Sequence, residues 1–207
     1  MISHELKCIF VHIPKCGGTS IEDIIWPMPR KVSDLWMGFI NEYENKYQTG
    51  GLQHLKGSQI CQEVGQEVYN SYYKFSFVRN PWDKAVSQYM YIKERKDLLE
   101  FIGMTSKDPF IKYLNLIQKI KHVQWEEQFK FVLDDNGELI VDYLGKLENF
   151  QEDVLVVLDK LKLDVDNIPH SKKTKRKSYD EYYDDESKEL IRNMYKIDIE
   201  TFGYTFD

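Results

Sequence analysis

The sequence predicts one α/β domain over residues 1–207, with a parallel core sheet flanked by helices. Short apolar segments of strand length are each followed by a turn and then by a segment of helical pattern, which is the order expected of a parallel sheet. A chain of 207 residues fits a single domain. A content of 42% hydrophobic and 30% charged residues is typical of a soluble globular protein.

The first strand–turn–helix segment begins with "KCIFVHI". Residues 7–13 are almost continuously apolar and rich in β-branched and aromatic side chains, which is typical of a strand buried on both faces. Gly17 and Gly18 then indicate a turn. Thr19 and Glu22 have the spacing of a capping box, which predicts that a helix begins here.

The second strand–turn–helix segment repeats this order. Residues 72–79, "YYKFSFVR", alternate as a strand does and end in an arginine. Asn80 is then expected as the N-cap, Pro81 as the first helical residue and Asp83 as an acidic residue of the first turn. The helix is expected to continue through residues 84–96.

The rest of the chain completes the predicted domain. Residues 108–120 have a helical pattern, and 129–148 are predicted to form a hairpin about Asn136-Gly137, with an antiparallel edge strand left open. Two more helices are expected, one capped by Asn149 and Glu152 and one beginning near Asp184 or Asp185. A basic loop, "SKKTKRKSY", separates them.

Charge and composition exclude several classes of protein. A formal net charge of −6 argues against a general nucleic-acid binder, so any anion site must be a local basic pocket. No apolar run approaches the roughly 20 residues that span a bilayer, and no signal-peptide pattern is visible. Cys8, Cys16 and Cys61 are odd in number and lack metal-type spacing. We therefore expect a cytoplasmic protein without a metal site.

The first turn contains the parts of an anion cradle. Its glycines would let backbone N–H groups approach an oxyanion, and the start of the helix adds a partial positive charge. Lys15 supplies a full positive charge, and Thr19 and Ser20 supply hydroxyl donors. The alternative is an ordinary tight turn with a solvated lysine. The pattern differs from a Walker A loop, in which the lysine follows the glycines.

The second turn also carries a cation and a hydroxyl group. Arg79 closes the predicted strand, and Ser87 lies two turns into the following helix. Arginine pairs bidentately with phosphate. Two such turns in one predicted sheet indicate a ligand with two separated anionic groups, held at the carboxyl ends of the strands.

These residues carry a resemblance to a known family. "IPKCGGTS" resembles the 5′-phosphosulfate loop of sulfotransferases, and "FVRNPWDKAVSQY" resembles their 3′-phosphate motif. The resemblance is strongest to the carbohydrate group that includes heparan 2-O- and 6-O- and chondroitin 4-O-sulfotransferases and their bacterial relatives. It extends through "GKLENF", "PHSKKTKR" and "DIETFGYTF" to cover nearly the whole chain. Many relatives have arginine where Lys84 stands, so no contact is expected there.

The resemblance implies a P-loop-like α/β fold and a sulfuryl donor, 3′-phosphoadenosine 5′-phosphosulfate (PAPS), which leaves as 3′-phosphoadenosine 5′-phosphate (PAP). It implies that Lys15 neutralises the leaving phosphate and that Arg79 and Ser87 hold the 3′-phosphate. The residues implied to hold the 5′-phosphosulfate are Lys15, Cys16, Gly17, Gly18, Thr19 and Ser20.

Residues 172–177, "KKTKRK", form a basic run in an acidic protein. Such a run is commonly a solvated loop, and that interpretation stays open. The alternative is a flap that closes over the nucleotide, with Lys173 and Arg176 as nucleotide contacts, or that meets an acidic acceptor. The resemblance favours the flap.

A hydroxyl acceptor requires a general base. His54 is the candidate, because it lies between the two nucleotide motifs, as the catalytic histidine does in the heparan enzymes that the chain resembles. An imidazole titrates near neutrality, which suits proton removal. His12 is expected to pack. Glu22 is an alternative base, although helix capping explains it without catalysis. His122 and His170 are weaker alternatives, and a purely structural role for His54 stays open.

The predicted function is sulfuryl transfer from PAPS to a hydroxyl acceptor, with a saccharide or glycoconjugate expected. A cysteine phosphatase is excluded, since a Cys-x5-Arg loop would need arginine at position 22, where the chain has Glu22. A nucleoside or small-molecule kinase with a degenerate loop is one alternative. A non-catalytic nucleotide-binding module is the other. A bacterial origin is expected, nucleic acid is not expected as a partner, and the oligomeric state stays open.

Overall fold

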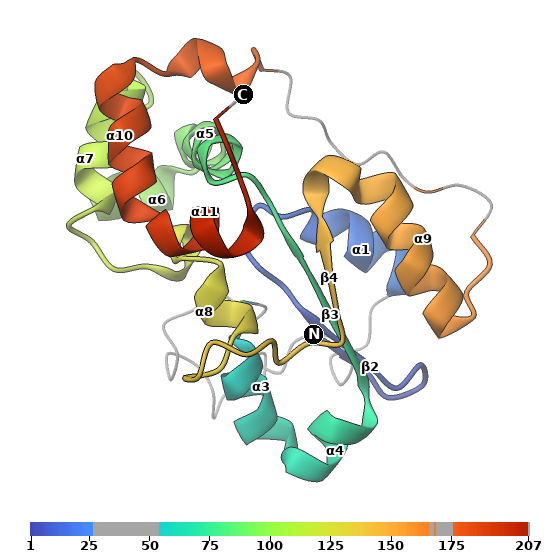
Figure 1. Cartoon of the computed structure of the whole chain (residues 1–207). Helices are drawn as coiled ribbons and strands as arrows, with labels where there is room; N and C mark the ends of the chain where they lie inside the picture. Colours follow the sequence, from blue (N-terminus) through green and yellow to red (C-terminus); the bar gives the residue numbers. More distant parts are fainter. Residues whose placement is uncertain (27–53, 166–167, 169–175, 207) are drawn as a thin grey trace. The chain divides into compact units, whose positions relative to one another are not determined.

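The computed structural model describes residues 1–26, 54–165, 168 and 176–206. These residues form two compact units, and each unit draws on two separate stretches of the chain (Figure 1). The first unit comprises the described residues within Met1–Val78 and Gln128–Lys172. The second comprises those within Arg79–Glu127 and Lys173–Asp207. That one domain extends over 1–207 stays a prediction.

The first unit contains the sheet. Its four strands lie in the order β1 (Ile2–Ser3), β2 (Cys8–Val11), β3 (Tyr73–Val78) and β4 (Tyr143–Lys146). The short β1 pairs antiparallel with β2, whereas β2, β3 and β4 are parallel. The prediction of an α/β fold with a mostly parallel sheet is therefore confirmed, and so are the strands expected within 7–13 and 72–79.

Both faces of this sheet are covered by helices of the first unit. On one face, Phe10 stacks on Phe75, and Phe77 lies beside Phe150 of α9 (Phe150–Leu161). Helix α1 (Gly18–Ile25) lies on the same side as α9 (Figure 1). On the opposite side lie α3 (Gly57–Val64), α4 (Gln66–Ser71) and α8 (Phe129–Val132). Burial on both faces explains the continuous apolarity of β2.

The second unit is helical. Helix α5 (Pro81–Lys93) packs against α6 (Lys96–Ile102), α7 (Phe110–Ile117) and α10 (Asp185–Met194), and α10 packs on α11 (Lys196–Phe202). Short 3₁₀ turns complete the described secondary structure: η2 (Val123–Trp125) and η4 (Tyr179–Tyr182) here, and η3 (Leu147–Asn149) in the first unit. The core of the second unit is aromatic and aliphatic, and it includes Trp82, Val86, Tyr89, Tyr113, Leu114, Trp125 and Ile191.

Helix α5 begins as the sequence predicts. The Asn80 side chain is the N-cap and accepts the backbone N–H of Trp82 over 3.0 Å. Pro81 is the first helical residue, where its missing N–H group has no intrahelical partner to lose. Asp184 likewise caps α10 and exchanges hydrogen bonds with Ser187, so the helix expected near this residue is confirmed. Helix α7 confirms the helical pattern of 108–120.

The capping box predicted for the first helix is wrong. The N-cap of α1 is Gly17, in a left-handed conformation with φ of 82°, and no side chain caps the helix. Glu22 is buried instead of reaching back to the helix start. Asn149 does precede α9, but its side chain makes no capping hydrogen bond, so only the helix itself is confirmed there.

The hairpin predicted over 129–148 is confirmed at its turn about Asn136-Gly137, where Asp134 N donates to Glu138 O over 2.9 Å, but not over its length. Part of the segment is helix α8, and a single antiparallel bridge joins Leu133 and Leu139. The Asp134 carboxylate accepts two backbone N–H groups of the intervening turn, from Asn136 over 2.9 Å and from Glu138 over 2.8 Å. The chain then continues into β4, which pairs parallel with β3 and not with its own predecessor. Local turn chemistry was visible in the sequence, whereas this long-range pairing was not.

Candidate functional site

A tight loop joins the carboxyl end of β2 to α1. Lys15 and Gly17 both adopt left-handed conformations, with φ of 64° and 82°. For a residue with a side chain this conformation costs about 1–2 kcal/mol, so the half-buried Lys15 is held in a strained backbone. Turns of this kind direct successive backbone N–H groups inward and form concave anion sites.

The start of α1 adds further donors to this loop. Gly18 and Thr19 open the helix, and the first N–H groups of a helix have no intrahelical partner. They lie at the positive end of the helix dipole. Thr19 is exposed, whereas Ser20 is buried and donates its N–H to Gly17 O over 3.0 Å. The structure thus brings the predicted cradle residues together in one turn, which we call the anion loop (Lys15–Ser20).

The two glycines of the anion loop are needed for different reasons. Gly17 has a positive φ, which a side chain would disfavour. Gly18 is helical, but a Cβ atom added there would lie 1.7 Å from Nε2 of His12. The imidazole of His12 therefore fills the space that any larger residue at position 18 would need.

Cys16 contributes its backbone to the anion loop, while its thiol points into the protein. The side chain is 1% exposed. Its Sγ atom donates to Oε1 of the buried Gln128 over 3.2 Å and lies 3.5 Å from the carbonyl oxygen of Pro14. This arrangement directs the sulfur away from solvent.

His54, the predicted base, is buried and held by a backbone contact. Its Nδ1 atom lies 2.9 Å from the carbonyl oxygen of His12. A carbonyl can only accept, so Nδ1 carries the proton and Nε2 keeps its lone pair. The two rings also meet edge to face, with their centroids 4.5 Å apart. The tautomer that a general base needs is therefore the one that this hydrogen bond selects.

Burial weakens His54 as a base. Desolvation lowers the pKa of His54 well below its ordinary value of 6.5, and the neighbouring His12 lowers it further. The hydrogen bond to the His12 carbonyl and the charge of Glu22 act in the opposite direction. The pKa near neutrality that the sequence suggested for this imidazole is therefore wrong. His54 is neutral, and able to accept a proton, at pH 7.

Beside His54 lies a pair of polar residues that the sequence did not link. His12 Nδ1 is 3.0 Å from Glu22 Oε1, and both side chains are almost completely buried. Desolvation lowers the pKa of His12 to about 3, so its ring is neutral at pH 7. Although the two atoms are close, Nδ1 makes no hydrogen bond of normal geometry among the described residues. The prediction that His12 packs is confirmed by its stacking on Phe10.

The second motif forms a cluster of two arginines around one carboxylate. Arg79 donates from Nε and Nη2 to Asp83 Oδ2, over 2.8 and 2.6 Å. Arg176 pairs with the other oxygen, Oδ1, of the same carboxylate. Two guanidinium groups therefore meet at one carboxylate. Ser87 is buried on α5, one turn beyond Asp83 on the same face.

The remaining predicted residues fall outside this arrangement. Lys173 and His170 lie outside the described residues. Lys84 is buried and donates its ammonium group to Glu126 O over 2.8 Å. His122 stacks on Trp125 and accepts the N–H of Gln124, which is a structural role.

Outside the gaps at 27–53, 166–167 and 169–175, no cluster of three or more His, Cys, Asp or Glu side chains could hold a metal ion. In the same described stretches, no helix is both long and apolar enough to cross a bilayer.

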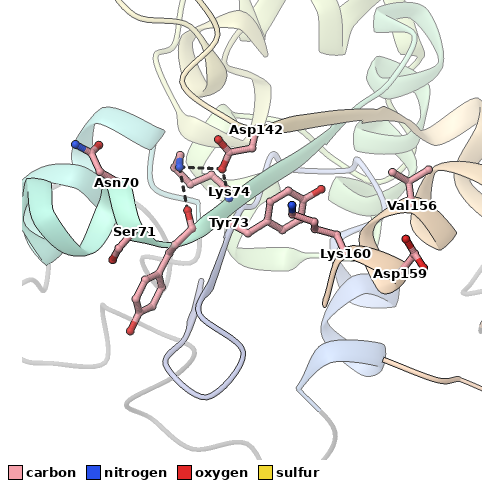
Figure 2. Close-up of a pocket in the computed structure, with 9 residues that line it drawn as sticks. Asn70, Ser71, Tyr73, Lys74, Asp142, Val156, Asp159 and Lys160 are labelled. Carbon is pink, nitrogen blue, oxygen red and sulfur yellow. Dashed lines mark hydrogen bonds and ion pairs between the residues drawn. The ribbon is translucent and has the colours of Figure 1, made fainter. Parts of the chain in front are cut away.

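An open hollow of about 590 Å³ lies at the other end of the sheet from the anion loop (Figure 2). Tyr73 and Lys74 begin β3 here, whereas the loop follows the carboxyl end of the parallel strand β2. The ammonium group of Lys74 pairs with Asp142 over 2.8 Å and donates to the carbonyl oxygen of Tyr72 over 2.9 Å. Because ligands of parallel sheets bind at carboxyl ends, this hollow forms no part of the candidate site.

Comparison with known proteins identifies the family. The sequence model described as Sulfotransferase family matches residues 1–205. An uncharacterized protein of Archaeoglobus fulgidus is 32% identical over 104 residues, which are 50% of this chain and 79% of that protein. The crystal structure of mouse sulfotransferase SULT7A1 complexed with PAP has the same fold, with a TM-score of 0.54 and 17% identity over 94% of this chain and 90% of that one. From the extent of the family match, this chain belongs to the sulfotransferase family.

Proposed function

We propose that this sulfotransferase moves a sulfuryl group from PAPS to a hydroxyl group of a saccharide or glycoconjugate. One observation carries the proposal: the ring of His12 lies against Gly18 of the anion loop and also contacts the ring of His54. His12 therefore contacts both the anion loop and His54, a histidine whose Nε2 atom can accept a proton. A base beside the bound donor is the arrangement that transfer to a hydroxyl group needs.

The donor is proposed to be held at both strand–helix turns. Lys15 and the backbone N–H groups of the anion loop would bind the 5′-phosphosulfate. Arg79 and Ser87 would bind the 3′-phosphate, with Arg176 and Lys173 as further contacts. The gathering of two guanidinium groups, those of Arg79 and Arg176, at Asp83 supports an anion there. The neighbouring fold of SULT7A1, solved with PAP, supports the choice of nucleotide.

The proposed reaction needs one base and one cation. His54 Nε2 accepts the proton of the acceptor hydroxyl as its oxygen forms a bond to sulfur. The bond between sulfur and the bridging oxygen breaks, and that oxygen leaves as part of PAP. Lys15 stabilises the negative charge that grows on the leaving phosphate, as expected for a reaction dominated by positioning and electrostatics. The products are the sulfate ester, PAP and one proton.

The proposed acceptor, and the expected origin and location of the protein, rest on the resemblance of the sequence to carbohydrate sulfotransferases. The motifs "IPKCGGTS" and "FVRNPWDKAVSQY" are similar to those of carbohydrate sulfotransferases, which favours a saccharide hydroxyl. The single domain over 1–207, the bacterial origin and the cytoplasmic location stay predictions.

Calorimetry tests the donor. PAP and PAPS should bind at least tenfold more tightly than AMP, because AMP lacks the 3′-phosphate and a hydrogen bond to a charged group is worth about 1.5–3 kcal/mol. Equal affinity for AMP and PAP would remove the role given to Arg79 and Ser87. Preference for ATP would favour the kinase alternative.

A transfer assay tests the reaction. The protein is incubated with PAPS labelled in its sulfuryl group and with a panel of neutral and amino-sugar oligosaccharides. Formation of labelled ester with release of PAP supports the proposal. Tight PAP binding with no transfer to any acceptor of the panel, and no release of sulfate to water, would favour a non-catalytic nucleotide-binding module.

A further inference from the structure

Glu22 is a buried carboxylate that helix capping does not explain. Its side chain is 6% exposed, on the face of α1 that packs against the sheet. Burying a carboxylate is costly unless a partner compensates for the lost hydration. The feature that stands out is the imidazole of His12, whose Nδ1 atom lies 3.0 Å from its Oε1 atom.

His12 is fixed in place from several directions. Its ring stacks on Phe10 with the centroids 5.2 Å apart, and its Nε2 edge lies against Gly18. The same residue contacts His54 twice, through its backbone carbonyl and through its ring. Any shift of the His12 ring must therefore disturb the anion loop, the candidate base, or both.

We propose that Glu22 and His12 form a positioning pair, in which Glu22 acts through His12 to hold His54 beside the anion loop. The inference rests on the proposed function, since it assumes that His54 is the base. The pair itself touches neither the sulfur nor the acceptor. Its role is analogous to the third residue of a catalytic triad, which orients the imidazole that acts as base.

The geometry indicates when the pair acts. His12 Nδ1 is a buried polar atom without a normal hydrogen bond among the described residues, although a carboxylate oxygen lies 3.0 Å away. Buried polar groups are rarely left in this state without a functional reason. Hydrogen bonds of active sites are often misaligned before ligands bind and tighten afterwards. Within the proposal, we expect this contact to become a hydrogen bond when the donor occupies the anion loop.

The charge of Glu22 also affects the pKa of His54, which a purely structural contact would not do. The charge of Glu22 raises the pKa of His54 against the effect of burial. The groups that lower it are the neighbouring His12 and the amino group of Met1. Removing the charge of Glu22 without changing its shape should therefore lower the pKa of His54 and leave a weaker base.

The variant Glu22→Gln tests this, with Asp23→Asn as its matched control. Asp23 is the adjacent carboxylate on α1 but is exposed, and its replacement changes the net charge equally. We expect E22Q to slow sulfuryl transfer by about tenfold or more, since misplacement by 1 Å can cost 10²-fold. PAP affinity should change little, and D23N should resemble the wild type.

Nuclear magnetic resonance supplies a readout that needs no acceptor. The imidazole signals of His54, assigned by their loss in His54→Ala, are titrated with acid in the wild type, E22Q and D23N. A fall of the His54 midpoint in E22Q alone supports the proposal. An unchanged midpoint together with an unchanged rate would overturn it.

A second pair of variants keeps the test decisive if E22Q does not fold. His12→Asn places an amide N–H near the position of Nδ1, whereas His12→Ala removes it and leaves the backbone carbonyl that His54 uses. Partial recovery of the rate in H12N relative to H12A supports positioning by the side chain, and equal rates in both overturn it. The proposed function fails separately, if His54→Ala keeps the full wild-type rate.

Discussion

His54 donates its Nδ1–H group to the backbone carbonyl oxygen of His12 over 2.9 Å. This hydrogen bond leaves Nε2 as the basic atom of a buried ring. The ring of His12, the residue that follows β2, also lies against Gly18. His12 therefore connects the candidate base to the anion loop.

Replacing Arg79 by alanine should weaken PAP binding at least tenfold. Asp83 holds the Arg79 guanidinium in place through Nε and Nη2. A guanidinium has five N–H donors, so it can also contact a phosphate. Loss of a charged hydrogen-bonding group costs about 1.5–3 kcal/mol. Calorimetry with PAP and with AMP measures the change, and AMP binding should be unaffected by the substitution.

Arg95→Ala is the matched control for this measurement. Arg95 is also an arginine paired with an aspartate, Asp97, but both side chains are largely exposed. Its loss removes the same charge from the protein. An equal loss of PAP affinity in R79A and R95A would show that only net charge matters, and would contradict a specific phosphate contact.

Gly18→Ala should destabilise the protein and impair PAP binding. The added methyl group would lie 1.7 Å from His12 Nε2, and forcing a group into a packed interior costs about 1–3 kcal/mol. Urea unfolding measures the loss. The double variant G18A/H12A should be less unstable than the sum of the two single variants, because removal of the imidazole makes room. Strict additivity would contradict the contact.

Cys16→Ser should keep sulfuryl transfer within a few-fold of the wild-type rate. The thiol donates to the buried Gln128, and a hydroxyl group can donate in the same direction. The backbone of the anion loop would be unchanged. A C16S protein that is folded and binds PAP but transfers nothing would restore a chemical role for the sulfur.

Acid should unfold the protein at a higher pH than titration of its carboxylates alone would predict. The pKa of His12 is lowered to about 3 by burial, whereas an unfolded histidine takes up a proton near pH 6.5. Below that pH the unfolded state binds more protons, so stability falls by up to about 1.4 kcal/mol per pH unit for each such histidine. His54, whose pKa is also lowered, should add to this slope.

Urea unfolding at pH 7, 6 and 5 measures the slope. In H54Q one buried titrating group is absent, and the free energy of unfolding should fall less steeply over this range than in the wild type. A wild-type stability that stays constant from pH 7 to pH 5 would contradict the buried, neutral state of both rings.

Local patterns in the sequence predicted much of this protein. The runs "KCIFVHI" and "YYKFSFVR" contain β2 and β3, in which nearly every position is buried. Asn80-Pro81 starts α5 because each residue suits its place at the helix start. The residues of the anion loop were also visible, since glycine, lysine and hydroxyl residues gather between a strand and a helix.

Contacts between distant residues were not predictable in the same way. Thr19 and Glu22 have capping-box spacing, yet Gly17 takes the N-cap in a left-handed conformation and Glu22 turns to His12. The Asp83 carboxylate meets Arg176, 93 positions away in the chain, and no local pattern records that pairing. The hairpin predicted over 129–148 is limited to its turn for the same reason, because β4 pairs with β3.

Sulfuryl transfer is proposed to use His54 as the base and Lys15 beside the leaving phosphate. The most direct test measures, in wild type, H54A and K15A, the rate of transfer from labelled PAPS, with PAP affinity determined on the same samples. We predict that H54A loses about 10²–10⁴ in rate, the usual contribution of a general base, with PAP affinity nearly unchanged. K15A should lose both rate and affinity. Transfer by H54A at the full wild-type rate would contradict the role of His54 as the general base.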